Sequence, residues 1–419
     1  MQKMLIKGGT ALNGIIKVQG AKNAALPVMA AAILLKGQTL ELDNVPDLQD
    51  VRTMAELLRQ LGADVRFKNG SMTINVPENL DWNTPAEQVR KMRASSLVLG
   101  PLLARCQKVI LPLPGGCAIG SRPIDFHLKA LKAMGAAITL KDGAVYAETN
   151  GRLKGTNIIF DFPSVGATEN IMMAAALADG STTIENAACE PEIVNLAETL
   201  RGMGVPVFGD GTPNIRIMGQ RFLKSSKASI VADRIEAVTY LIGGVLSKGK
   251  VTVTGIEPQL LTVALQKLED IGAKLTLAPD SITAEYAGKL KAVSIRTMPH
   301  PGFPTDAQPQ FMALLSVADG TSVIHEGIFE SRLMHVPEFN KMGTKIAVQE
   351  NTAIVEGVSE IFGAEVYATD LRAGAAMILL GITADGVTKV GNLHHVWRGY
   401  ENIVEKMNSL GANISLIED

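Results

Sequence analysis

The 419-residue sequence has few aromatic, cysteine and histidine side chains. Aromatic residues make up only 4% of the chain, so aliphatic side chains and alanine must form its core. The three cysteines, Cys106, Cys117 and Cys189, are odd in number and widely spaced, which is not the pattern of a disulfide framework. Neither a C-x-x-C nor an H-E-x-x-H motif is present, and the histidines show no ligand spacing, so we expect no metal site.

The sequence also lacks a strong net charge and a long apolar run. Its formal net charge is −2 and its pI is about 6.4, which argues against a general nucleic-acid binder. The longest apolar runs, residues 24–35 and 373–384, fall well short of the ~20 residues that cross a bilayer. The first residues contain no apolar region of the signal-peptide kind. We therefore expect a cytoplasmic protein without a nucleic-acid or membrane partner, and its oligomeric state stays open.

The sequence does contain a five-residue motif that recurs six times: a large apolar residue, glycine, a small residue, any residue and an apolar residue. Its glycines are Gly62, Gly135, Gly204, Gly272, Gly343 and Gly411, so the steps are 73, 69, 68, 71 and 68 residues. Repetition at a fixed period indicates repeated supersecondary units. Six units of about 70 residues account for the whole chain.

Each unit contains two helical patterns of different character. An amphipathic pattern leads into each repeated glycine, which we expect to end the helix in the left-handed conformation. These segments are residues 51–61, 126–134, 193–203, 261–271, 334–342 and 403–410. An earlier segment is apolar or small nearly all round and should be buried. These are residues 24–35, 94–104, 167–178, 237–246, 309–318 and 373–382, and in five units a glycine turn follows, at Gly37, Gly180, Gly249, Gly320 and Gly386.

Alternating segments complete the unit as strand, buried helix, strand, amphipathic helix, strand, strand. We predict an α/β (α+β) fold of two similar domains, each made of three βαβαββ repeats with the buried helices inside, an inside-out α/β barrel. The first domain should span residues 22–228. The second should combine residues 1–21 with 229–419, with the active site in the cleft between the two.

The starts of the buried helices carry polar and cationic residues. Lys22, Arg93, Arg234 and Arg372 lie at such starts, where the helix end already carries partial positive charge. Cations there are unfavourable without an anion, so we infer a phosphate-rich ligand. Ordinary capping by serine, threonine and aspartate is the alternative at residues 164–168, 305 and 370. Asp306 is the best acid/base candidate, with a helix cap as its alternative.

A cysteine loop is the most distinctive single stretch. In residues 111–125, prolines 112 and 114 precede Cys117, three glycines flank it, and Arg122 follows five residues later. A thiol beside a cation ionises more readily and can act as a nucleophile. A surface turn with an incidental cysteine is the alternative. Arg122, Arg332 and Arg398 each precede an amphipathic helix in their units, although any one of them alone reads as a surface arginine.

Together these residues resemble the enolpyruvyl transferases over essentially the whole chain. The motifs that carry the resemblance are residues 20–25, 92–95, 113–117, 120–123, 164–168, 190–193, 303–306, 368–372 and 398–400. The resemblance implies transfer of the enolpyruvyl group of phosphoenolpyruvate to the 3-hydroxyl of UDP-N-acetylglucosamine, the first committed step of peptidoglycan synthesis, with no metal or organic cofactor. The relatives that use shikimate 3-phosphate share the fold but lack the Pro-Gly-Gly-Cys loop.

The resemblance also implies residue roles. Asp306 would take the proton from the sugar hydroxyl, and Cys117 would protonate the methylene carbon and react with fosfomycin. Phosphoenolpyruvate would contact Lys22, Asn23, Arg93, Arg122, Arg332, Arg372 and Arg398. UDP-N-acetylglucosamine would contact Asn23, Arg93, Arg122, Pro123, Ile124, Asp125, Phe126, Ser164, Val165, Gly166, Thr305, Asp306 and Ile328.

Four positions depart from the family pattern. Leu97 stands where many relatives have a tryptophan, and Gln49 where some have a lysine. Phe162-Pro163 replaces a lysine-containing pair, and Cys189 occupies a place often held by arginine. The missing cations would weaken substrate binding. Two alternatives stay open: transfer to another acceptor such as shikimate 3-phosphate, and a non-catalytic paralogue that binds the sugar nucleotide.

Overall fold

The computed structural model describes residues 2–113 and 124–418, so Cys117, Arg122 and Pro123 lie outside the described residues. The described chain divides into two compact units. Residues 20–113 and 124–231 form one of them, which we call the inserted unit. Residues 2–19 and 232–418 form the other, which we call the split unit because its sequence lies on both sides of the first.

The βαβαββ repeat is clearest in the third copy. Its elements are β9 (Asn157–Ile159), α6 (Val165–Ala176), β10 (Ser181–Glu185), α7 (Pro191–Gly202), β11 (Val207–Phe208) and β12 (Asn214–Met218). β9 pairs parallel with β10, β10 pairs antiparallel with β12, and β12 pairs antiparallel with β11. The order of strands in this sheet is therefore β11-β12-β10-β9, as a strand–helix–strand crossover followed by a hairpin requires.

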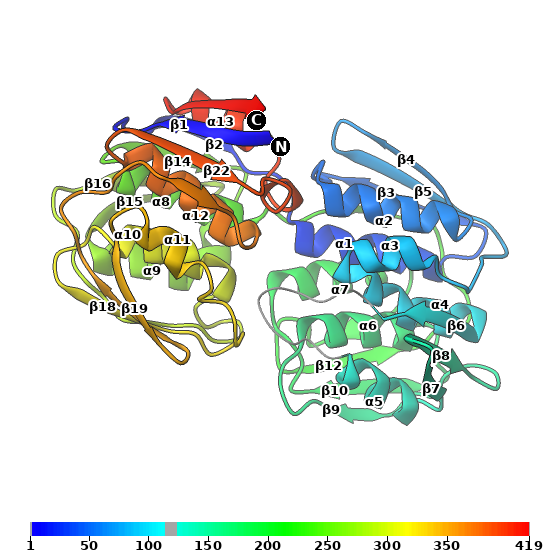
Figure 1. Cartoon of the computed structure of the whole chain (residues 1–419). Coiled ribbons are helices and arrows are strands. Elements are labelled where there is room, and N and C mark those ends of the chain that lie inside the picture. The colour runs from blue at the N-terminus through cyan, green and yellow to red at the C-terminus, as the bar shows by residue number, and fades with distance from the viewer. Residues whose placement is uncertain (1, 114–123, 419) are drawn as a thin grey trace. The chain divides into compact units, whose positions relative to one another are not determined.

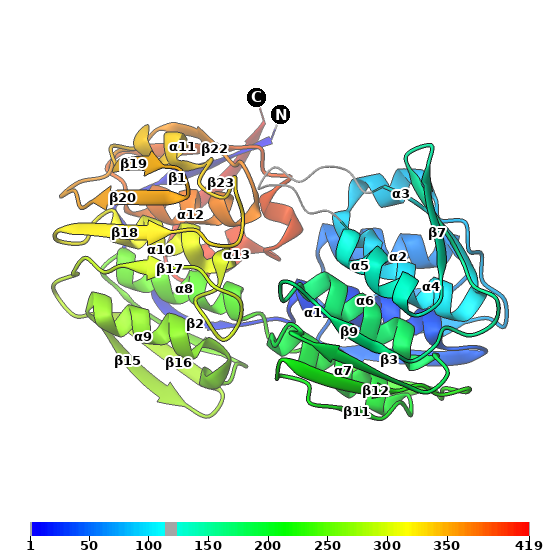
Figure 2. The same ribbon diagram turned by 90° about the horizontal axis from the view of Figure 1, so that it is seen from below.

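The predicted buried helices form the core of each unit. They are α1 (Lys22–Ala31), α4 (Leu99–Cys106) and α6 in the inserted unit, and α8 (Arg234–Leu246), α10 (Gln308–Leu315) and α12 (Leu371–Thr383) in the split unit. Their residues are buried almost all round, as the near-absence of a polar face predicts. In each unit the sheets lie outside these helices (Figure 1; Figure 2).

The predicted amphipathic helices form the second helix of each βαβαββ repeat. They are α2 (Gln49–Gln60), α5 (Asp125–Ala133), α7, α9 (Thr262–Ile271), α11 (Val336–Asn340) and α13 (Ile403–Ser409). All six repeated glycines that follow them have positive φ angles, between 90° and 110°, so the predicted left-handed helix ends are confirmed. Helix α11 is shorter than predicted because residues 331–335 form turns, and a short helix α3 (Ala86–Lys91) was not predicted.

One predicted glycine turn is wrong in its reason. At the turn after α8, Lys248 carries the positive φ angle of 60°, and Gly249 does not. A Cβ atom on Gly249 would lie 2.0 Å from the carbonyl oxygen of Leu12, so this glycine permits close approach of two backbones. In the one repeat without a glycine here, Gln107 takes the left-handed conformation with a φ angle of 61°.

Three strands pair away from their sequence neighbours. β2 (Asn13–Lys17) pairs parallel with β14 (Lys250–Thr254), and β13 (Ser226–Ser229) pairs parallel with β3 (Gln38–Asp43). β1 (Gln2–Lys7) lies between β22 (Val387–Gly391) and β23 (Asn413–Glu418), the position that β12 holds in its own sheet. The remaining strands are β4 (Asp64–Lys68), β5 (Ser71–Val76), β6 (Lys108–Pro112), β7 (Ala137–Lys141), β8 (Ala144–Glu148), β15 (Ala273–Ala278), β16 (Ser281–Tyr286), β17 (Ile295–Arg296), β18 (Thr321–His325), β19 (Lys345–Gln349), β20 (Thr352–Glu356) and β21 (Glu365–Tyr367).

The second repeat has the smallest sheet. Its order is β6-β8-β7, and an isolated parallel bridge between Asn83 and Ile110 stands where the other repeats have a full strand. None of the helices in the described ranges is long and apolar enough to cross a membrane. The predicted fold class, two similar units of three repeats with buried central helices, is confirmed.

Candidate active site

In the inserted unit, the three central helical segments begin without a carboxylate. The N-cap residues are Ala21 before α1, Met92 before the 3-10 segment Arg93–Val98 that leads into α4, and Ser164 before α6. Lys22 and Arg93 are the first residues of the first two segments. Two of these three positive helix ends therefore carry a cation, at the positions that the sequence indicated.

Lys22 has a protein counter-ion. Its Nζ lies 3.6 Å from Oδ2 of Asp50 in α2, and both side chains are nearly inaccessible to solvent. Asp50 is a residue that sequence reasoning missed, because only the fold brings α1 and α2 together. Burial of the pair holds the ammonium group in place at the start of α1, whereas the neighbouring Asn23 is exposed.

The start of α6 offers backbone N–H groups. Oγ of Ser164 accepts a hydrogen bond from the N–H of Ala167 at 3.4 Å, which satisfies the third residue of the helix. The N–H groups of Val165 and Gly166 belong to the first turn and have no helical partner. On the neighbouring α5, Asp125 is exposed and the ring of Phe126 lies 6.1 Å from that of Phe160. Ile124, half-buried, is the N-cap residue of α5.

In the split unit, Asp306 binds two buried arginines. Its Oδ1 accepts from Nη2 of Arg332 at 3.2 Å, and its Oδ2 accepts from Nε and Nη2 of Arg372 at 3.2 and 3.1 Å. The two arginine side chains are almost fully buried, whereas the carboxylate is 27% exposed. Two guanidinium charges thus face one carboxylate, and Arg332 Nε and Arg372 Nη1 keep N–H groups without a partner among the described residues.

A buried network holds Arg372 in place. The Arg372 guanidinium lies 5.5 Å from the ring centre of Tyr400, whose hydroxyl lies 3.0 Å from Oγ1 of Thr239. The Gln310 amide is assigned with its oxygen accepting from Tyr400 and Thr239 and its nitrogen donating to the backbone of Asp306 at 3.2 Å. Burial opposes the charge of Arg372, but Asp306 and then Tyr400 more than offset it, so the pKa of Arg372 is raised.

Glu326 positions two predicted binding residues and was missed from sequence. It is 1% exposed, and its Oε2 accepts from Oγ1 of Thr305 at 3.0 Å. Its Oε1 accepts from the N–H of Ile328 at 2.8 Å and from Oγ1 of Thr297 at 2.7 Å. One buried carboxylate therefore fixes both the Thr305 turn and the Ile328 turn. The available signal was a glutamate directly after the buried end of a strand.

The other predicted arginine of this unit lies in a short 3-10 turn. Arg398 ends the turn Val396–Arg398 and is half-buried. Beneath Arg332, the fully buried His335 donates through Nδ1 to the carbonyl oxygen of Arg332 at 3.0 Å. Burial lowers the pKa of His335 to about 4, against an opposing effect of Asp370. His335 is therefore neutral at physiological pH and supports the backbone that carries Arg332.

The four departures from the family pattern lie in different environments. Leu97 is 5% exposed and belongs to the core, whereas Gln49 and Phe162 are exposed. Cys189 is half-buried and donates through Sγ to the carbonyl oxygen of Ala187, and burial, followed by Glu190, raises the pKa of its thiol. A thiol with a raised pKa does not replace the positive charge of an arginine.

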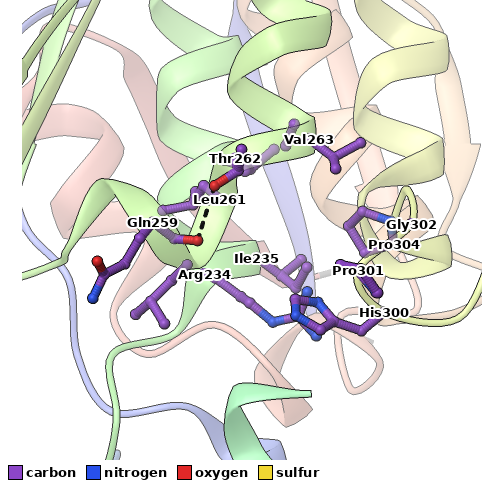
Figure 3. A pocket seen from close by; sticks show the side chains of 13 residues that line it. Arg234, Ile235, Gln259, Leu261, Thr262, Val263, His300, Pro301, Gly302 and Pro304 are labelled. Atoms are coloured by element: carbon purple, nitrogen blue, oxygen red, sulfur yellow. Dashed lines mark hydrogen bonds between the residues drawn. The ribbon is translucent and has the colours of Figure 1, made fainter. Parts of the chain in front are cut away.

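A cavity of about 240 Å³ lies in the split unit, between the starts of α8 and α9 and the loop His300–Pro304 (Figure 3). Arg234 and the His300 ring lie on one side of it, and Thr262 donates a hydrogen bond to the carbonyl oxygen of Gln259 on another. Of the four cations from which we inferred a phosphate-rich ligand, Arg234 lines this cavity, whereas none of the residues that the family resemblance assigns to substrate does. In the described residues, no group of three or more histidine, cysteine, aspartate or glutamate side chains is arranged to hold a metal ion.

The predicted site residues thus form two sets. The inserted unit carries Lys22, Asn23, Arg93, Asp125, Phe126 and Ser164 with the residues that follow it, and the split unit carries Thr305, Asp306, Ile328, Arg332, Arg372 and Arg398. The first set offers cations and backbone donors for an anion. The second offers a carboxylate beside fixed positive charge, which suits proton removal at a reacting hydroxyl.

Sequence comparison assigns these repeats, with their charged helix starts, to a family. A family model described as EPSP synthase (3-phosphoshikimate 1-carboxyvinyltransferase) matches residues 6–407. The chain belongs to this family. The resemblance to enolpyruvyl transferases that the motifs indicated is confirmed.

The names of individual relatives specify the substrate more closely than the family description does. The chain is 51% identical to UDP-N-acetylglucosamine 1-carboxyvinyltransferase 2 of Carboxydothermus hydrogenoformans, with 100% of both chains covered. It is 50% identical to UDP-N-acetylglucosamine 1-carboxyvinyltransferase 1 of Halalkalibacterium halodurans, covering 100% of this chain and 95% of the relative.

Solved structures share the fold. The enolpyruvyl transferase NikO of Streptomyces tendae has a TM-score of 0.91 at 26% identity, covering 99% of this chain and 98% of its own. The EPSP synthase of Acinetobacter baumannii has a TM-score of 0.79 at 20% identity, with both chains fully covered, and shows the fold alone.

Proposed function

We propose that this chain transfers the enolpyruvyl group of phosphoenolpyruvate to the 3-hydroxyl of UDP-N-acetylglucosamine and releases phosphate. The observation that carries the proposal is the full-length match to two relatives named for this reaction, at 51% and 50% identity. The reaction is the first committed step of peptidoglycan synthesis. Both substrates are small molecules, and we place the enzyme in the cytoplasm without a membrane or nucleic-acid partner.

The proposed chemistry is addition followed by elimination. Asp306 takes the proton of the sugar hydroxyl, whose oxygen bonds to C2 of phosphoenolpyruvate, while Cys117 gives a proton to the methylene carbon. The new methyl group of the tetrahedral intermediate then returns a proton to the thiolate left at Cys117, and the C–O bond to phosphate breaks, which restores the double bond. No electron acceptor is needed, because the overall change is a substitution at C2.

Fixed positive charge assists the phosphate as it leaves. Lys22, Arg93, Arg122 and Arg398 would hold the phosphate and carboxylate of phosphoenolpyruvate, and Arg332 and Arg372 would support them. The geometry in the split unit supports Asp306 as the base that takes the proton of the sugar hydroxyl, because its two arginine partners hold the carboxylate in one orientation. The guanidinium groups of Arg332 and Arg372 also place two buried positive charges beside the partly exposed carboxylate.

The nucleotide part of the acceptor would bind the inserted unit. Ile124, Asp125 and Phe126, with Arg122 and Pro123, would surround the uridine, and residues 164–166 would bind the diphosphate at the start of α6. Asn23, Thr305, Asp306 and Ile328 would hold the sugar. The buried Glu326 supports this assignment for Thr305 and Ile328, because it fixes both turns.

Phosphate release from phosphoenolpyruvate tests the proposal, with UDP-N-acetylglucosamine or shikimate 3-phosphate as acceptor. We expect release only with the sugar nucleotide. Release with shikimate 3-phosphate, the substrate in the description of the family model, would overturn the acceptor. Release with neither would favour a binding protein without turnover.

The cysteine assignment has its own test. Cys117→Asp should keep turnover, because a carboxylic acid can also donate a proton, but should lose sensitivity to fosfomycin, because a carboxylate is a poor target for alkylation. Inhibition assays on the wild type and the variant, after the same preincubation, give the comparison. A variant that stays fully sensitive would remove Cys117 from this role.

A further inference from the structure

Helix α6 contains a buried side-chain amide, that of Asn170. Asn170 is fully buried, and its Oδ1 accepts from the backbone N–H of Gly100 at 2.5 Å. Its Nδ2 donates to the carbonyl oxygen of Ser96 at 2.7 Å. Both partners are backbone groups whose donor and acceptor roles cannot change, so the orientation of the amide is determined.

This orientation determines the tautomer of His127 in α5. The second hydrogen of Asn170 Nδ2 points to Nδ1 of His127, 3.0 Å away. Because Nδ2 carries only hydrogens, Nδ1 must be the acceptor, and the proton of the neutral ring is on Nε2. A second proton on Nδ1 would place two donors against each other.

The Nε2–H group lies beside the start of α6. A Cβ atom built on Gly166 would be 3.6 Å from Nε2, and no acceptor among the described residues bonds to this nitrogen. The His127 side chain is otherwise enclosed, since the residue is only 6% exposed. The N–H groups of Val165 and Gly166 open at the same place, because Ser164 caps only Ala167.

We propose that His127 is a specificity-determining residue whose Nε2–H donates a hydrogen bond to the diphosphate of the sugar nucleotide bound at the start of α6. This inference rests on the proposed function, which puts a diphosphate there. It adds a side-chain donor that none of the family motifs includes. It also gives a role to a polar ring and an asparagine that are buried beside the start of α6.

A neutral donor fits this place better than a second cation. Burial, and after it the positive charge of Arg93, lowers the pKa of His127 to about 4, so the ring keeps one proton through the physiological range. Arg93 supplies the positive charge that attracts the anion, and His127 supplies a directional hydrogen bond that orients the diphosphate. A hydrogen bond to a charged acceptor is stronger than one between neutral groups.

Binding of UDP and of UDP-N-acetylglucosamine, measured by calorimetry on the full chain, tests the donor. His127→Phe should raise the Kd of both about 10- to 100-fold, the size of a lost hydrogen bond to a charged group. The KM for phosphoenolpyruvate should change far less. His127→Gln keeps an acceptor for Asn170 and a donor near Nε2, so it should recover most of the affinity.

A second variant covers the case in which His127→Phe fails to fold. Gly166→Ala leaves the Asn170–His127 pair intact and places a methyl group against Nε2, so the Kd of UDP should rise in the same direction. Long-range ¹H–¹⁵N spectra should show Nδ1 unprotonated from about pH 5 to 8, as a pKa near 4 requires.

The outcomes separate the two proposals. If wild type releases phosphate with UDP-N-acetylglucosamine but His127→Phe or Gly166→Ala binds UDP as wild type does, the inference on His127 is wrong and the function stands. If wild type shows no turnover, the proposed function fails, while UDP affinity still decides the role of His127. A protonated Nδ1 would overturn the inference by itself.

Discussion

The two units repeat one plan, yet they differ at the starts of their central helices. In the split unit, Asp233 and Asp370 cap α8 and α12, and Asp306 lies in the turn before α10. In the inserted unit the equivalent positions are Ala21, Met92 and Ser164, none of them charged. A carboxylate neutralises the positive end of a helix and repels an anion, whereas an uncharged cap leaves that end open to one.

Two of the four cations that the sequence predicted to attract a ligand anion lie beside carboxylates of the protein. Arg372 donates to Asp306, and Lys22 lies beside Asp50. The repeat therefore supplies equivalent positions, and the residues at each position decide whether a helix start receives a ligand or a carboxylate of the chain.

Removing Asp306 should have the largest effect. Asp306→Ala should lower turnover by about a thousandfold, because a general base is lost, while UDP-N-acetylglucosamine still binds. It should also cost ~3 kcal/mol or more in unfolding free energy, since Arg332 and Arg372 stay buried without their carboxylate. Phosphate release and urea unfolding measure the two effects. Near-normal turnover would remove Asp306 from the mechanism, and Asp306→Asn controls for side-chain volume.

The second largest effect is expected when a charged N-cap, as found in the split unit, is introduced into the inserted unit. Ser164→Asp keeps a good cap on α6 but adds a negative charge, so the Kd of UDP-N-acetylglucosamine should rise about a hundredfold at little cost in stability. Ser164→Asn is the matched control, because it has the same shape without the charge. Equal affinities of the two variants would show that no anion binds at this helix start.

One buried histidine in each unit gives a smaller, symmetrical effect. Burial lowers the pKa of His127 and of His335 from 6.5 to about 4, so the unfolded chain binds these protons more readily than the folded chain. The stability they contribute is complete above pH 6.5 and falls as the pH drops toward 4. Between pH 7.5 and 5 each should cost ~2 kcal/mol.

Urea unfolding at the two pH values measures this loss. Because His127 belongs to the inserted unit and His335 to the split unit, His127→Gln should remove about half of the histidine contribution. An unchanged pH dependence in that variant would show that His127 titrates normally in the folded protein.

The smallest expected effect is that of the N-cap hydrogen bonds on the free energy of unfolding. Oδ1 of Asp233 accepts from the N–H groups of Ile235 and Glu236, so Asp233→Ser should keep the cap and change the unfolding free energy by less than ~0.5 kcal/mol. Asp233→Ala should cost about 1 kcal/mol, and Ser164→Ala a similar amount. Thermal unfolding of the four chains checks this, and a much larger loss for Asp233→Ser would mean that its charge has a further partner.

The sequence was sufficient for the repeat because its signals are local. Each glycine stop follows directly from its own helix, and each buried segment is apolar over its whole length. The sequence placed residues 1–21 with the second domain, but it did not predict which strands β2 and β13 pair with, since the partners lie more than 180 residues away. Gly249 was misassigned for the same reason: the backbone of Leu12 constrains it.

The candidate site divides in a similar way. Motifs identified the residues that would face substrate, whereas Asp50, Glu326 and Asn170 emerged only from the fold. Each of these three is buried and acts on a neighbour from another element, so no spacing in the sequence marks it. The residues that hold a site in position are therefore harder to predict than the residues that would form it.

The position of β1 and β2 has a consequence for synthesis on the ribosome. The inserted unit has its last strand by Ser229, so it can fold while the rest of the chain is still being made. The first two strands have no partners until β14, β22 and finally β23 emerge. The strands β1 and β2 are thus synthesised first but are among the last to pair. A nascent chain must therefore carry two unpaired strands for most of its synthesis.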